Sequence, residues 1–403
     1  MVELNKIYQA KQKIADFVLK TPFVHSSFLS EFLETDVFLK CENLQKTGAY
    51  KIRGAYNTIA NLTKEQKQAG VIAASAGNHA QGVAISAKKF DIEAVIVMPE
   101  ATPLLKVSAT KNLGAKVILK GDNFDEAYAY ALNYAKEHHL NFIHPFENES
   151  IIAGQGTLML EMLDEISDLD MILAPVGGGG LISGVASAAK QINPAIKVIG
   201  VSAKGAPAMY ESFKSKKMIN SKAVRTIADG IAVRDVNKIN FDIILECVDD
   251  FIQVDDEEIA NAVLYLLEKH KITVEGAGAS AVAALLHKKI DLKNHKKIGV
   301  ILSGGNIDVQ MLNIIIEKGL FKAFRKMHIN VTLIDKPGAL SALSDAIKEA
   351  QANIVKIDYD RFSTKLEYGD AMISITLETK GKEHQELVRK ILYDKGFNFN
   401  EIL

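Results

Sequence analysis

Cysteine, net charge and long apolar runs are all scarce in this chain of 403 residues. Its two cysteines, Cys41 and Cys247, are far apart and lack metal-site spacing, so we expect buried thiols in a reducing compartment. A net charge of -1 leaves no basic excess for binding nucleic acid. No stretch of about 18 residues lacks both charge and glycine, so we expect no membrane-spanning helix. The first residues precede no apolar run, so we expect no secretory signal and a cytoplasmic location.

Strand and helix patterns alternate over most of the chain. The predicted strands are residues 37–40, 70–74, 94–98, 116–119, 171–176, 195–201 and 298–302. The predicted helices are residues 7–19, 49–62, 78–89, 123–138 and 154–164. This alternation predicts an α/β fold in which helices cover the faces of a parallel sheet. Ligands of such folds bind beside the turns that follow the strands.

Asp255 and Glu258 precede an apolar pattern of helical spacing. Asp255 is predicted to cap this helix, and Glu258 is predicted to reach back to the capping residue. Because a capping box explains these acidic residues more simply than metal ligation does, we expect no metal site there.

The pattern changes after Gly319. Elements in the order strand, helix, strand, strand, helix are predicted at residues 327–334, 339–351, 353–359, 370–378 and 384–394, with a short last strand within 397–402. This order suits a ferredoxin-like domain. Because the chain is too long for one core, we expect separate domains at residues 1–325 and 326–403, divided near Arg325.

The first chemical motif is residues 47–55, Thr-Gly-Ala-Tyr-Lys-Ile-Arg-Gly-Ala, which sets Lys51 at the expected start of a helix. Tyr50 offers a flat apolar face, while Gly48 and Gly54 permit close approach of other groups. An aldehyde cofactor needs a primary amine whose pKa is lowered by burial or by neighbouring cations. An exposed helix lysine is the simpler alternative, so the interpretation of Lys51 depends on the motifs that follow.

The second motif, Ser75-Ala76-Gly77-Asn78-His79, follows an apolar strand and opens a helix. Backbone N–H groups at a positive helix end favour an anion, and a substrate carboxylate is the natural candidate. Asn78 can also donate to a ring oxygen of a cofactor. Ordinary capping by Ser75 or Asn78 is the alternative. His79 is interpreted as a structural hydrogen-bonding residue rather than as an acid or base.

The third motif is the tract Gly177, Gly178, Gly179 and Gly180, which is followed by Leu181 and follows an apolar strand. Four consecutive glycines are costly in conformational entropy. That cost is recovered where backbone N–H groups must wrap a phosphate. The tract has neither dinucleotide-binding spacing nor the Gly-Lys-Ser/Thr ending of a P-loop. A flexible hinge is the alternative, which the apolar strand before it disfavours.

The fourth motif begins with Ser303, which ends the last apolar strand and precedes Gly304-Gly305-Asn306. A hydroxyl partner leaves a pyridine nitrogen largely unprotonated, which suits elimination better than a long-lived carbanion. A plain turn is the alternative. Together the four motifs supply an amine for an aldehyde, a loop for a phosphate and polar groups for a ring, which are the parts that hold pyridoxal phosphate.

The four motifs resemble those of the fold-type II pyridoxal-phosphate enzymes, specifically the threonine dehydratases (threonine ammonia-lyases), over residues 1 to about 320. The resemblance implies two open twisted parallel-sheet subdomains of the tryptophan synthase β kind. The small subdomain is expected at about residues 50–145, inserted in the large one.

The resemblance also implies roles for the motif residues. Lys51 carries the cofactor as an imine beside Tyr50, and its freed amine removes the Cα proton of L-threonine. Asn78 contacts the phenolic oxygen of the cofactor, residues 177–181 its phosphate and Ser303 its ring nitrogen. The loop from Ser75 to His79, with Ala76 and Gly77, holds the substrate carboxylate. Loss of the β-hydroxyl as water and hydrolysis of the enamine then yield 2-oxobutanoate and ammonia, and L-serine yields pyruvate likewise.

Serine dehydratase and serine racemase are the alternatives within these enzymes. Serine racemases use a serine just before the Gly-Asn pair as a second proton donor, whereas Ala76 has no acidic hydrogen. Cysteine synthases and threonine synthases place threonine after the loop asparagine, where this chain has His79. A non-catalytic amino-acid sensor is the alternative of a different class, and the intact Lys51 and Ser303 count against it.

The C-terminal part resembles an ACT domain through the pattern Asp335-x-Pro337-Gly338-x-Leu340. Such domains pair across subunits and bind amino acids. The resemblance therefore implies a homodimer or homotetramer with isoleucine or valine as the effector at these residues, and a role in isoleucine biosynthesis with catabolic use left open. The Asp-x-Pro-Gly pattern also occurs in ordinary loops, which is the alternative.

Overall fold

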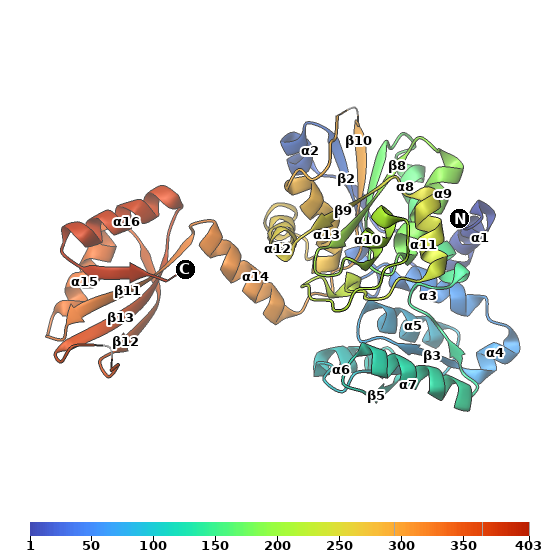
Figure 1. Cartoon of the computed structure of the whole chain (residues 1–403), viewed down its shortest axis with the longest axis horizontal. Helices are drawn as coiled ribbons and strands as arrows, with labels where there is room; N and C mark the ends of the chain where they lie inside the picture. Colours follow the sequence, from blue (N-terminus) through green and yellow to red (C-terminus); the bar gives the residue numbers. More distant parts are fainter. Residues whose placement is uncertain (294, 365, 403) are drawn as a thin grey trace. The chain divides into compact units, whose positions relative to one another are not determined.

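The computed structural model describes residues 1–293, 295–364 and 366–402 (Figure 1). The chain divides into two compact units, Met1–Asp308 and Val309–Leu403. The division therefore falls earlier than the boundary expected near Arg325, and helix α14 (Val309–Lys322) groups with the second unit. An ion pair between Lys326 and Glu317 links this helix to the strand that follows it.

The first unit contains a six-stranded sheet in the order β1-β2-β10-β7-β8-β9. Its strands are β1 (Phe23–His25), β2 (Asp36–Cys41), β7 (Met171–Pro175), β8 (Lys197–Ala203), β9 (Asp250–Val254) and β10 (Lys297–Leu302). Only the edge pair β1–β2 is antiparallel among these strands. The central strand β7 is buried along its whole length, as expected for a strand covered by helices on both faces.

Helices cover both faces of this large sheet (Figure 1). They are α1 (Leu4–Ile14), α2 (Ser27–Leu33), α8 (Glu149–Glu165), α9 (Gly180–Ile192), α10 (Ala208–Ser215), α11 (Lys238–Cys247), α12 (Asp256–Tyr265) and α13 (Gly276–Leu286). Short 3-10 turns occupy η1 (Glu42–Leu44) and η2 (Asp229–Ile231), and a π-helical turn occupies η3 (Leu266–His270). Apolar residues of α8, α9 and α11 share one core with β7, while α13 packs against β7 and β10.

A second, four-stranded sheet of the same unit has the order β5-β4-β3-β6 and is parallel throughout. Its strands are β3 (Val71–Ala74), β4 (Ala94–Met98), β5 (Lys116–Leu119) and β6 (Asn141–Phe142). Its helices are α3 (Lys51–Ala60), α4 (Lys64–Ala69), α5 (Asn78–Lys89), α6 (Leu104–Asn112) and α7 (Phe124–Glu137). The predicted α/β fold with parallel sheets is confirmed.

The second unit contains an antiparallel sheet whose strands lie in the order β12-β13-β11-β14. Its elements are β11 (Lys326–Ile334), α15 (Ala339–Glu349), β12 (Asn353–Asp360), β13 (Asp370–Glu378), α16 (Lys382–Asp394) and β14 (Asn398–Glu401). Alternate residues of β11 and β13 are buried, and apolar residues of α15 and α16 share their core. The predicted ferredoxin-like order of elements is confirmed.

Several predicted elements keep their bounds and others do not. Helix 78–89 and strands 94–98, 116–119 and 370–378 have the predicted ends. The predicted helix 7–19 is too long at its end, because α1 stops at Ile14. The side chain of Gln45 bonds both the N–H and the carbonyl of Leu19, which holds that residue outside the helix. The capping box of Asp255 and Glu258 is confirmed at the start of α12.

Among the described residues, no helix is both long and apolar enough to cross a membrane.

Candidate active site

The first unit contains a cavity of about 1040 Å³ lined by the segments that follow β3, β7 and β10. The carboxyl ends of parallel strands thus meet at this cavity, which is where open α/β sheets bind ligands. All four sequence motifs contribute to its wall. The predicted site residues that line it are Tyr50, Lys51, Ser75, Ala76, Gly77, Asn78, His79, Gly177, Gly178, Gly179, Gly180, Leu181 and Ser303.

Lys51 is the first residue of α3 and lies in the cavity wall. Its Nζ donates a hydrogen bond of 3.0 Å to the carbonyl oxygen of Pro145. The same Nζ is 5.4 Å from the ring centroid of Tyr50 and 5.9 Å from that of Phe146. Burial lowers the pKa of Lys51 to about 8, and the nearby charge of Glu275 partly opposes this shift. A lysine with such a pKa supplies the neutral amine that attacks an aldehyde.

The glycine tract joins β7 to α9 through Gly179, whose φ of +87° is a conformation that glycine adopts without strain. A Cβ atom on Gly178 would lie 2.6 Å from the ring of Phe146, and one on Gly177 would lie 2.8 Å from the Cα of Ile231. Within the part of the chain that the structure describes, no side chain caps the N-terminus of α9. The helix therefore presents unsatisfied N–H groups and a positive dipole end to the cavity, which suits a phosphate.

The carboxamide of Asn78, at the start of α5, is bonded on both sides. Its Nδ2 donates to Oε1 of Glu275 over 2.7 Å, and its Oδ1 accepts from Nδ2 of Asn306 over 2.8 Å. Asn306 Nδ2 also donates to the carbonyl of Thr47 over 2.7 Å. These bonds tie the second and fourth motifs to the segment that precedes Lys51.

His79 is buried, and its Nε2 lies 2.8 Å from the carbonyl oxygen of Ile143. Because a carbonyl only accepts, Nε2 carries the proton and donates. Burial, together with the charge of Lys51, lowers the pKa of His79 to about 3, so the ring is neutral. This contact supports a structural role for the His79 side chain.

The two serines of the motifs differ in their surroundings. Ser75 Oγ accepts a hydrogen bond of 3.2 Å from the backbone N–H of Gly77, which shapes the turn before α5. Ser303 is buried at the end of β10, and its carbonyl accepts the backbone N–H of Tyr50 over 3.1 Å. The strand that carries Ser303 is thereby fixed against the residue next to Lys51.

Phe146, Asn237, Asn240 and Glu275 also shape the site, although no sequence motif indicates them. Asn237 and Asn240 donate to the carbonyl of Gly178 over 2.9 and 2.7 Å, and Asn240 also donates to the carbonyl of Phe146 over 3.1 Å. These bonds hold the glycine tract and the segment beside Lys51 in one arrangement. Asn237 and Asn240 read in the sequence as an ordinary helix cap, and Phe146 and Glu275 are isolated, so no local pattern marks these residues as part of a site.

Two ion pairs join residues of the cavity wall that belong to different sheets. Lys106 of α6 lies 3.1 Å from Asp229 of η2. Arg234 lies 2.6 Å from Asp125 of α7. Helices α6 and α7 pack on the small sheet, whereas Asp229 and Arg234 lie in the segment between strands β8 and β9 of the large sheet.

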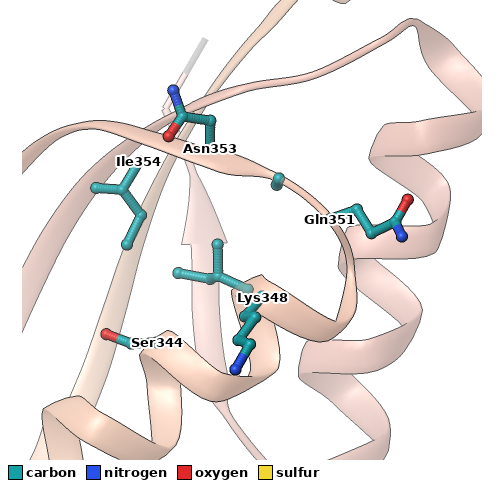
Figure 2. Close-up of a pocket in the computed structure, with 7 residues that line it drawn as sticks. Ser344, Lys348, Gln351, Asn353 and Ile354 are labelled. Carbon is teal, nitrogen blue, oxygen red and sulfur yellow. The ribbon is translucent and has the colours of Figure 1, made fainter.

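The predicted effector residues Asp335, Pro337, Gly338 and Leu340 lie in the second unit, around the turn that starts α15. Gly338 has a φ of +89°, and Asp335 accepts a hydrogen bond of 2.7 Å from the hydroxyl of Tyr359. A pocket of about 450 Å³ in this unit lies instead where α15 ends and β12 begins (Figure 2). Its wall contains Ser344, Lys348, Gln351, Asn353 and Ile354, and none of the predicted effector residues.

A lysine of lowered pKa that shares a cavity with the glycine-lined start of a helix is the arrangement of an enzyme that binds an aldehyde cofactor. The family described as "Pyridoxal-phosphate dependent enzyme" matches residues 14–304, and the chain belongs to it.

Individual relatives are more specific than the family as a whole. The chain is 46% identical to an L-threonine ammonia-lyase of Thermotoga maritima over 397 residues, which are 98% of both chains. It is also 46% identical to the Staphylococcus aureus L-threonine dehydratase catabolic TdcB over 323 residues, 79% of this chain and 93% of the relative. The structure of maize serine racemase superposes with a TM-score of 0.75 at 37% identity, covering 80% of this chain and 98% of that one.

Proposed function

We propose that the chain is an L-threonine ammonia-lyase that converts L-threonine to 2-oxobutanoate and ammonia, with L-serine giving pyruvate as a secondary reaction. The observation that carries the proposal is the position of Lys51, whose amine shares one cavity with the glycine tract, Asn78 and Ser303. The name of the Thermotoga maritima relative, which matches almost end to end, supports this choice of reaction.

The cavity wall fits pyridoxal phosphate. Lys51 would bind the aldehyde, and the uncapped start of α9 with residues 177–181 would hold the phosphate. Asn78 would face the phenolic oxygen and Ser303 the ring nitrogen. When bound, the cofactor supplies an electron sink that makes the Cα proton of an amino acid acidic.

The side chains of Lys51 and Ala76 then account for elimination rather than racemisation. With a pKa of about 8, the Lys51 amine can accept the Cα proton close to neutral pH and hold it as an ammonium group. The loop before α5 would bind the substrate carboxylate through the backbone N–H groups of Gly77 and Asn78. Ala76 offers no proton to the opposite face of the substrate. Departure of the β-hydroxyl as water is therefore favoured over racemisation.

The test is a comparison of the wild-type chain with Lys51→Ala. Wild-type protein supplied with pyridoxal phosphate is expected to absorb visible light, to be labelled at Lys51 by borohydride and to release 2-oxobutanoate from L-threonine. Lys51→Ala is expected to lose all three properties. Release of 2-oxo acid by the variant would contradict the assigned base, and a colourless wild-type protein would favour the sensor alternative. Formation of D-serine faster than pyruvate would favour the racemase.

We also propose that the second unit is an ACT domain that binds isoleucine or valine beside Asp335–Leu340 and that the chain forms a homodimer or homotetramer. The support is the ferredoxin-like order of its elements and the ordered turn of Asp335 and Gly338. Isoleucine or valine is expected to change the threonine activity of the wild-type chain, and Asp335→Asn is expected to weaken this response. A response to isoleucine would favour biosynthetic use, and no response would favour the catabolic use named for the Staphylococcus aureus relative.

A further inference from the structure

Glu275 is a buried carboxyl group in the cavity wall to which the proposed reaction gives no role. It is 4% exposed and stands at the N-cap position of α13. Its side chain nevertheless accepts no capping hydrogen bond from its own helix. The carboxyl group instead meets residues of two other elements, Asn78 of α5 and Asn306 after β10.

Two donors reach the Glu275 carboxyl group. Asn78 Nδ2 donates to Oε1 over 2.7 Å, and the backbone N–H of Asn306 donates as well. The backbone N–H of Glu275 itself donates to the carbonyl of Gly304 over 3.0 Å. A Cβ atom on Gly304 would lie 2.4 Å from Oε1, so the glycine at this position leaves the room that the carboxyl group occupies.

While Glu275 is ionised, these contacts favour one orientation of the Asn78 carboxamide. In the observed orientation, Nδ2 donates to Glu275 and Oδ1 accepts from Asn306. The reversed orientation would set Oδ1 against the carboxyl oxygen of Glu275 and one amide donor against the other. A donor or acceptor that is buried without a partner costs about 1–3 kcal/mol, so two lost bonds disfavour the reversed state strongly.

The charged groups around Glu275 come from three elements. Burial raises the pKa of Glu275 to about 7, and Asp229 of η2 adds to this shift. The bond from Asn78, the charge of Lys106 on α6 and the bond from Asn306 oppose it. Glu275 and Lys51 line the same cavity, and the charge of Glu275 partly opposes the lowering of the Lys51 pKa by burial.

We propose that Glu275 is a positioning residue that fixes the Asn78 carboxamide so that the second hydrogen of Nδ2 remains available to the phenolic oxygen of the cofactor. This inference rests on the proposed function. Asn78 Nδ2 has two hydrogens, of which Glu275 takes one. The ionised carboxyl group suits this task because both of its oxygens accept, whereas an amide at position 275 would offer one acceptor and one donor.

The first test is the variant Glu275→Gln with Glu3→Gln as the matched control. Glu3 is also an N-cap glutamate without a capping bond, but it is exposed at the start of α1. Glu275→Gln is expected to weaken pyridoxal-phosphate binding about 10-fold in equilibrium dialysis and to shift the visible absorption band. Glu3→Gln is expected to match the wild-type protein in both measurements.

A double-mutant comparison tests whether Glu275 acts through Asn78. In an Asn78→Ala background, Glu275→Gln is expected to change cofactor affinity by less than about 2-fold, because the group that it orients is gone. Equal effects in the two backgrounds would overturn the proposal. Asn306→Leu removes the bond on the other side of the carboxamide, and it is expected to shift the band as Glu275→Gln does. It therefore serves as the test if Glu275→Gln does not fold.

The outcomes separate this inference from the proposed function. A wild-type protein that gives no visible band with pyridoxal phosphate would refute the cofactor site itself. A wild-type band that Glu275→Gln leaves unchanged in position and affinity would refute only the role of Glu275. A lower melting temperature of the cofactor-free variant with an unchanged band would show a purely structural residue and would also overturn the proposal.

Discussion

The ring of Phe146 lies so close to Gly178 that a Cβ atom at position 178 would be 2.6 Å from it. The carbonyls of both residues accept hydrogen bonds from Nδ2 of Asn240, so neither backbone is free to move aside. The aromatic ring thus forces glycine at the second position of the tract, independently of any bound ligand. The glycine tract is therefore shaped by its protein neighbours as well as by the phosphate that it would hold.

Gly178→Ala is expected to weaken pyridoxal-phosphate binding about 10-fold or more, because the added methyl group pushes Phe146 or the tract out of place. Equilibrium dialysis and visible absorbance measure the change. Glu3→Gln, an exposed substitution at the start of α1, is the control and is expected to bind the cofactor as the wild-type protein does. Equal affinities of the two variants would contradict this steric explanation. Phe146→Leu added to Gly178→Ala is expected to restore part of the affinity.

The lowered pKa of Lys51 predicts a pH dependence of the cofactor-free protein. Burial lowers this pKa from 10.5 to about 8, so the unfolded chain binds the proton more tightly than the folded one. The free energy of unfolding should therefore rise with pH between about 8 and 10.5, relative to a chain without this amine. Lys51→Met is expected to be more stable than the wild-type protein at pH 7, by on the order of 3 kcal/mol, and the difference should vanish above pH 10.5. Urea denaturation at several pH values measures it, and a difference that does not change with pH would refute the assigned titration.

Elements and site residues are predicted best from the sequence where they form a local pattern that would be energetically unfavourable without the fold or the site. Strand 94–98 is a run of buried apolar residues, and its bounds are confirmed. Four glycines in a row are unfavourable unless the backbone needs them, which is why this tract stands out. Contacts between distant residues carry no such local signal. Glu275 and Asn78 are 197 positions apart, and only the packing of α13 and α5 brings them together.

Two helices that the sequence pattern does not predict, α13 and α14, show where the hydrophobic pattern alone is insufficient. Helix α13 is buried on all sides and rich in glycine and alanine, so it has no polar face from which a helical period is recognised. Helix α14 is rich in apolar residues, yet Ile315 is its one buried residue, so its apolar residues do not show which unit it packs against. The pattern therefore does not assign α14 to either unit, and the expected boundary near Arg325 follows the change in strand pattern instead.

A buried charge cluster beside α3 predicts a large stability effect. Arg53 donates to both oxygens of Glu42 and of Glu161, and Lys40 donates to Glu161. Burial alone would raise the pKa of Glu42, but the charge and hydrogen bonds of Arg53 outweigh burial and hold it below its usual value. Glu42 therefore adds stability above pH 4.5, and this is lost as the pH falls through its lowered pKa.

Arg53→Met is expected to lower the free energy of unfolding by about 3–5 kcal/mol at pH 7, because it leaves buried carboxylates unpaired. The loss should shrink as the pH falls, because Glu42 without Arg53 takes up a proton more readily in its buried position. Lys20→Met is the control, since Lys20 forms an exposed pair with Glu165 and should matter by less than about 1 kcal/mol. Equal losses in the two variants, measured by urea denaturation, would refute the importance of the buried cluster.

The ion pairs of the cavity wall predict a salt-dependent KM. Arg234 and Asp125 come from segments of different sheets, and Asp125 is exposed while Arg234 is half-buried, so their attraction is weak and is screened by salt. The KM of the wild-type protein for L-threonine is expected to rise up to about 5-fold with added sodium chloride, as the two sides of the cavity separate more easily.

Asp125→Asn should have the raised KM at low salt and little salt dependence, with kcat nearly unchanged. Asp242→Asn, which removes a partner of Lys238 within α11, should behave as the wild-type protein does. A salt-independent wild-type KM would show that this pair does not help to hold the cavity closed around the substrate.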